Sequence, residues 1–212
     1  MKKFDKIIFL ACGLLLTLAA FPVFAQKNTE LNKKPLRDFA DLLNQKIADK
    51  KVDLNAPFSV ELELLLTDKG RIDAKKSKFT RSEGDKQIIE VVTLAIDAVN
   101  DSGMFAFLKG LGFEKANLAL SQNNEDFSAI LSSEQSTSQN ALTVSSGLNF
   151  LIKLAFKADA DGKRKLDEDE KMLLTGLKIL TNDKKVVLSF SSTKSAFQEM
   201  ITRNLEDDRD IQ

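Results

Sequence analysis

The chain has 212 residues, with 31 Lys and Arg against 31 Asp and Glu, so its formal net charge is zero. This balance gives no electrostatic reason to expect nucleic acid or an anionic membrane as a partner. The sequence contains no His, Trp or Tyr, and its single cysteine is Cys12. Histidine-dependent triads and histidine zinc sites are therefore excluded, and all thiol chemistry depends on one residue.

Residues 1–25 have the layout of a secretory signal peptide. A lysine-rich start precedes an apolar segment from Ile7 to Ala20, and Val23-Phe24-Ala25 supplies small residues for cleavage after Ala25. We expect export to the periplasm or out of the cell. Two alternatives are an uncleaved anchor, which needs about 20 apolar residues, and a lipoprotein carrying its lipid on Cys12. The mature form would hold no thiol and no stable membrane span.

The rest of the chain is long enough for one domain with a sizeable core. We expect a flexible polar leader over 26–34, a single α+β domain over 35–205 and an acidic tail over 206–212. A charged segment at 157–165 is a possible internal boundary.

The first half of the domain reads as a helix followed by two strands and two helices. Apolar residues recur at helical spacing over 36–49, and strict alternation from Phe58 to Leu66 predicts a strand. Asp68-Lys69-Gly70 predicts a tight turn, followed by a return strand over about 71–80. A break at 82–85 then caps a helix that ends near Asn100, and a short apolar helix follows over 104–110.

The second half repeats this order. Strands are predicted at 116–120 and 127–131 around a turn at 123–126, followed by a helix from about 136 to 155. A helix over 167–180, a strand over 186–190 and a last helix to 205 complete the chain. The pattern predicts an antiparallel sheet built from two strand-strand-helix units, with an N-terminal helix and a C-terminal helix-strand-helix, and with helices covering the sheet.

Two short motifs suggest chemistry without completing it. In the segment 157–168, Asp159, Asp161 and Glu168 match positions of a calcium loop, but Lys157 stands where the first carboxylate is needed. We therefore interpret the segment as a solvated turn that leads into an acidic helix start. Ser191-Ser192-Thr193-Lys194 is a Ser-x-x-Lys sequence at a strand-to-helix junction, but no Lys-Thr-Gly partner exists. A helix cap accounts for it. We therefore predict no catalytic residue, cofactor or metal site.

Two other stretches are candidate contact surfaces. Lys75, Lys76, Lys78 and Arg81 form a basic cluster that either contacts a partner or protects an edge strand from mispairing. The apolar segment Met104 to Leu108 is either a patch for a partner or membrane or, as we expect, part of the core.

The region 57–100 resembles the C-terminal domain of the TonB family. The resemblance rests on Val60-x-Leu62-x-Leu64, the turn Asp68-Lys69-Gly70-Arg71-Ile72, the break Ser82-Glu83-Gly84-Asp85 and the helix that follows. TonB-like proteins are anchored in the inner membrane and bind the periplasmic plugs of outer-membrane transporters. The resemblance thus implies a hairpin-helix unit and a protein partner.

These observations favour an exported, non-enzymatic protein that acts by protein–protein contact and accepts a partner strand at its lysine-rich edge. An alternative is a module for a small apolar or lipid ligand, because 15 phenylalanines are available to line a cavity. A hydrolase using Ser and Lys or paired carboxylates is a third hypothesis. No nucleic acid partner is expected.

Overall fold

The protein is described here from a computed structural model, and the structure describes residues 31–207. The predicted signal peptide at 1–25, residues 26–30 of the predicted leader and residues 208–212 of the predicted tail lie outside the described residues. The other two residues of the predicted tail belong to the last helix, which ends at Asp207.

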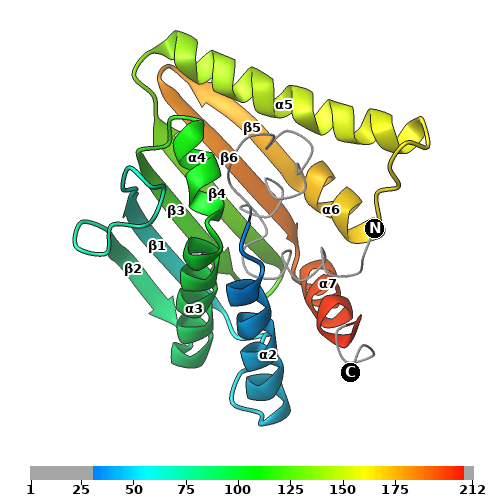
Figure 1. The fold of residues 1–212 in the computed structure, drawn as a ribbon. Helices are drawn as coiled ribbons and strands as arrows, with labels where there is room; N and C mark the ends of the chain where they lie inside the picture. The colour runs from blue at the N-terminus through cyan, green and yellow to red at the C-terminus, as the bar shows by residue number, and fades with distance from the viewer. Residues whose placement is uncertain (1–30, 208–212) are drawn as a thin grey trace.

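Six antiparallel strands form one sheet in the order β2-β1-β3-β4-β6-β5 (Figure 1). The strands are β1 (Phe58–Leu65), β2 (Lys78–Gly84), β3 (Lys115–Gln122), β4 (Asp126–Glu134), β5 (Leu177–Asn182) and β6 (Lys185–Thr193). The described helices are α2 (Lys34–Ala48), α3 (Lys86–Ser102), α4 (Met104–Gly110), α5 (Ser138–Ala160), α6 (Glu168–Gly176) and α7 (Lys194–Asp207). This arrangement confirms the predicted α+β class and the antiparallel sheet.

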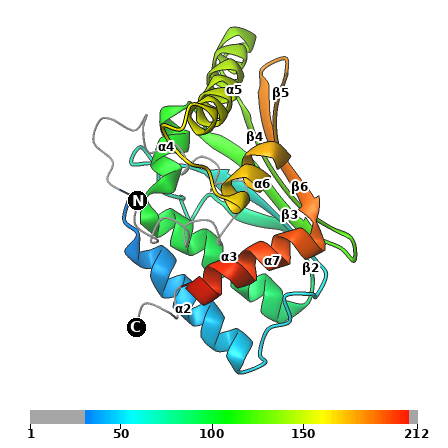
Figure 2. The ribbon, with the colours of Figure 1, turned by 90° about the vertical axis from the view of Figure 1, so that its right-hand side faces the viewer.

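The core lies between the sheet and the helices, which gather on one face (Figures 1 and 2). Strand residues alternate between the two faces, and the pairing register aligns a buried aliphatic row across five strands: Leu62, Leu118, Leu131, Leu188 and Ile179. The opposite face carries a row of small hydroxyl side chains in the same way: Ser59, Ser121, Ser128 and Ser191. Residue type therefore decides which face meets the helices.

Several helix ends are fixed by side chains that the sequence supplies. Asp85 accepts bonds from the backbone of Gln87 and Ile88 and so begins α3, while Gly103 ends it at φ +85°. Asp167 and Glu170 form a reciprocal capping box at the start of α6. These caps place each helix relative to the strand that precedes or follows it.

Two predicted elements were wrong in their bounds. The return strand predicted over 71–80 begins only at Lys78 and runs on through the predicted break to Gly84. Most of the segment before it is a turn, and an isolated bridge joins Ile72 to Leu66, the residue that follows β1. The helix predicted over 167–180 ends at Gly176, and the next six residues form β5.

Within residues 31–207, no single helix is long and apolar enough to cross a membrane. Only α3 and α4 together reach the length and composition, and a bend of 68° separates them. The apolar segment that begins α4 is part of the core as predicted: Met104, Phe105 and Leu108 are 3% exposed or less.

Candidate functional site

The outer edge of β2 is an exposed edge of the described sheet. All seven residues of β2 are exposed, and among the strands of residues 31–207 it pairs only with β1. Figure 1 shows β2 at one end of the sheet, with no described element along its outer side. At the other end, β5 is bordered by α5, where Asn149 Nδ2 donates to the carbonyl of Ile179 at 3.3 Å. The two edges of the sheet therefore differ in access.

The hydrogen-bond pattern identifies the β2 peptide groups that face outward. Asp85 N donates to Pro57 O at 3.3 Å, and Leu66 N donates to Glu114 O at 2.9 Å. Bonded and non-bonded pairs alternate along an antiparallel ladder. In the register of β1 with β2, this alternation makes Ser82 and Val60 a non-bonded pair. The N–H and C=O of Ser82 therefore point away from β1, toward solvent.

Two irregularities limit the length of this open edge. The register shifts between Glu61 and Leu62, so Thr80 is the extra residue of a β-bulge. Gly84 has φ +111°, and a Cβ there would lie 2.4 Å from Pro57 O. The regular part of the edge is thus centred on Ser82, between Arg81 and Glu83.

The structure separates the four predicted contact residues into two groups. Lys75 and Lys76 lie in the turn before β2, whereas Lys78 and Arg81 belong to the strand. Three of their charges have nearby carboxylates: Lys76 with Asp73 (3.6 Å), Lys78 with Glu63 (3.2 Å), and Arg81 with Glu83 and Glu61 (2.7 and 3.7 Å). The cluster is therefore a surface of alternating charge rather than a basic patch.

The Arg81–Glu83 pair is the closest of these contacts. The hydrogen bond from Arg81 and its positive charge lower the pKa of Glu83, and the bond to Glu83 raises the pKa of Arg81. Both side chains are well exposed, so water screens the interaction and its contribution to stability is small. Its consequence is geometric: a cation and an anion lie side by side on the uncovered face of β2.

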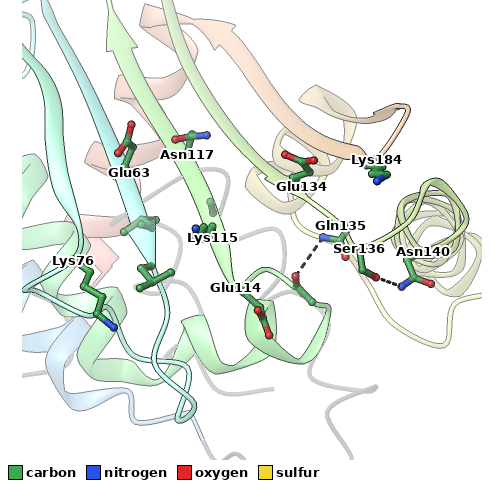
Figure 3. A pocket seen from close by; sticks show the side chains of 14 residues that line it. Glu63, Lys76, Glu114, Lys115, Asn117, Glu134, Gln135, Ser136, Asn140 and Lys184 are labelled. Atoms are coloured by element: carbon green, nitrogen blue, oxygen red, sulfur yellow. Dashed lines mark hydrogen bonds between the residues drawn. The ribbon is translucent and has the colours of Figure 1, made fainter.

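A groove of about 1000 Å³, lined by both charged and apolar residues, opens where β1 and β4 end and β3 begins (Figure 3). Its walls come from the ends of β1, β3 and β4 and from the segments around them. Six charged side chains line it in equal numbers of each sign: Glu63, Glu114, Glu134, Lys76, Lys115 and Lys184. Asn140 Nδ2 donates to Ser136 Oγ at 2.7 Å on one wall. Such a lining suits a polar ligand that carries both donors and acceptors, such as a polypeptide backbone.

One of the four predicted contact residues lies in this groove. Lys76 is part of its lining, and so is Glu63, the ion-pair partner of Lys78. Lys75, Lys78 and Arg81 do not line it. The sequence gives no signal for the groove, because its residues come from distant strands and become neighbours only through the pairing of β1, β3 and β4.

An apolar cleft lies between the sheet and helices α2, α3 and α7. It is bordered by Phe39, Leu43, Leu54, Phe58, Ile88, Val91, Val92, Ala95, Leu120, Gln122, Phe127, Phe197 and Ile201. The rings of Phe127 and Phe197 stack across it with centroids 3.6 Å apart. Its volume is about 70 Å³, whereas pockets for drug-sized ligands measure roughly 300–1,000 Å³. The cleft as it stands has room for a small apolar group, and lipid binding stays a prediction.

The residues of the two short motifs already have structural contacts. Lys194 Nζ donates to Asn55 O at 2.6 Å, so its ammonium group is held by the loop that precedes β1. Asp159 accepts from Leu166 N at 2.8 Å and pairs with Lys171 at 2.9 Å. The bond from Lys171 has the largest effect on Asp159 and lowers its pKa, and the bond from the Leu166 N–H lowers that pKa further. In the described part of the chain, no group of three His, Cys, Asp or Glu residues is placed to hold a metal ion.

Comparison of the chain with protein-family models, with curated proteins and with solved structures finds no match. The candidate sites are therefore argued from the geometry of this chain.

Proposed function

We propose that this chain is an exported, non-enzymatic protein that acts by protein–protein contact, and that it accepts an extended segment along the open edge of β2. The single observation that carries the proposal is the outward peptide group of Ser82, on a strand that pairs on one side only within the described part of the chain. An added strand gains main-chain hydrogen bonds there, and side chains on alternate faces give it specificity.

The surroundings of the edge support this function. Lys75, Lys76, Lys78 and Arg81 are the proposed contact residues, with Lys78 and Arg81 on the strand and the other two at the groove end of β2. Export is supported by the signal-peptide pattern of residues 1–25, and a TonB-like hairpin-helix unit by the resemblance over 57–100. Both belong to the proposal.

Replacing Ser82 by proline tests the edge directly. Proline removes the outward N–H and places its ring where an added strand must approach, but it removes no bond to β1, so it is tolerated on the outer side of an edge strand. Linear twelve-residue peptides selected against the wild-type chain from a displayed library should bind Ser82→Pro at least about tenfold more weakly. Fluorescence anisotropy measures the affinities.

Ser82→Ala is the matched control, because it removes the hydroxyl and keeps the N–H. Its peptide affinity should equal that of the wild type, and urea midpoints should be similar for all three proteins. Peptides that bind Ser82→Pro as tightly as the wild type would contradict strand addition at β2.

A further inference from the structure

The centre of β2 is complementary to itself when two strands run antiparallel. Arg81 and Glu83 flank Ser82, and both direct their side chains to the uncovered face of the sheet, opposite Glu61 and Ser59. A twofold axis through Ser82 brings each Arg81 opposite Glu83 of a second copy. The same symmetry turns the two outward Ser82 peptide groups toward each other.

Neighbouring registers lack this match. An axis through Arg81 places two guanidinium groups opposite each other, and an axis through Glu83 does the same with two carboxylates. Like charges directly opposite on paired strands are destabilising. The backbone hydrogen bonds also favour the axis at Ser82. In this register the two Ser82 residues form a hydrogen-bonded pair. Arg81 and Glu83 then form non-bonded pairs, whose Cα atoms approach to about 4.5 Å.

We propose that the partner strand at the β2 edge is β2 of a second copy of this chain, paired antiparallel about a twofold axis at Ser82. This inference rests on the proposed function and names its partner. The two sheets then join into one, because the axis runs perpendicular to the sheet and keeps the helices of both copies on the same side.

Exposed apolar area near the strand is consistent with this pairing. Phe79 is 44% exposed on β2, and its pairing with Leu62 beyond the bulge places it on the helix side of the sheet. The bulge at Thr80 and the unusual backbone of Gly84 keep the new ladder short. The contact is therefore smaller than a standard interface of about 1,600 Å² and belongs to the weak class.

Charge reversal at one position should disrupt the dimer. Sedimentation velocity of the wild-type chain over about 10–300 μM, a range suited to a weak contact, should show a monomer–dimer equilibrium. Arg81→Glu alone, or Glu83→Arg alone, replaces two attractive cross-strand pairs by two repulsive ones. The dimer dissociation constant of each should rise about tenfold or more.

Mixing these two variants should restore dimerisation. In the heterodimer, each introduced glutamate meets an introduced arginine, and the remaining Glu83 meets the remaining Arg81, so both cross-strand pairs are attractive again. Native mass spectrometry distinguishes the heterodimer from either homodimer by mass. Misfolding cannot produce this rescue, and circular dichroism with urea midpoints confirms that each variant is folded.

Three results would overturn the inference: a wild-type chain that stays monomeric at about 300 μM, single variants that dimerise like the wild type, or folded variants that fail to form a heterodimer. The proposed function fails by a different measurement. If the wild-type chain is monomeric but its selected peptides still need the Ser82 N–H, the second copy is ruled out as the partner and strand addition is kept. If the peptides bind Ser82→Pro as tightly as the wild type, strand addition itself is ruled out.

Discussion

Replacing Phe190 by alanine should lower the free energy of unfolding by roughly 3–5 kcal/mol. Phe190 lies on β6 with 1% of its surface exposed. Its ring packs against Gly176, where an added Cβ would lie 2.7 Å from Phe190 Cε2, and against Phe127 with centroids 6.3 Å apart. Truncation removes the apolar burial and leaves a cavity that the close-packed sheet and helices refill only in part. Urea denaturation followed by circular dichroism measures the loss.

Phe150→Ala is the matched control for this prediction. The same atoms are removed, but Phe150 is 58% exposed on α5, so little buried area is lost. Its free energy of unfolding should stay within about 0.5 kcal/mol of the wild type. Equal losses from Phe150→Ala and Phe190→Ala would contradict the described core.

The contact between Phe190 and Gly176 also explains why β5 could not be predicted from the sequence. Around this point, Leu173, Leu174, Leu177 and Leu180 recur at helical spacing, which favours one continuous helix. The helix instead ends at Gly176, where the Phe190 ring fills the space that a side chain would need. The packing that ends the helix comes from β6, and the local pattern for β5 is only the short alternation of Leu177, Lys178 and Ile179.

The displaced start of β2 has a different physical cause. Strands with one buried face show an alternating pattern, and β1 was predicted almost to its true bounds for that reason. Every residue of β2 is exposed, so its sequence carries no such period. Its position is set by pairing with β1 and by the polar turn before it, where Ile72 N donates to Asn100 Oδ1 at 2.7 Å.

The candidate site was therefore predictable only in its broad location. The lysine-rich cluster marks the exposed edge, because charged residues accumulate where a strand lacks a covering helix. The carboxylates that pair with Lys78 and Arg81 belong to β1 and to β2 itself. Their distances from these cations depend on the pairing register of the two strands. The hairpin-helix order over 57–100 agrees with the observed β1, β2 and α3, while the TonB resemblance stays a prediction.

The turn that joins β1 to this edge gives a second large expected effect: Gly70→Ala should lower the free energy of unfolding by about 3 kcal/mol or more. Gly70 has φ +67°, a conformation in which an L side chain is strained. An added Cβ would also lie 2.3 Å from the Cα of Ala106 on α4. This Cα is a backbone atom, so rotating a side chain cannot relieve the clash.

Gly162→Ala separates these two contributions. Gly162 has nearly the same φ, +68°, but nothing lies within 4 Å of a Cβ added there. Alanine at this position should therefore lower the free energy of unfolding only by the strain of the left-handed conformation, about 1–2 kcal/mol. The difference between the unfolding free energies of the two variants, measured by urea denaturation, gives the contribution of the close packing of the 67–70 turn on α4. If Gly70→Ala costs no more than Gly162→Ala, that turn does not rest on α4. The groove lining at Lys76, six residues further along, would then lose its fixed position relative to the sheet.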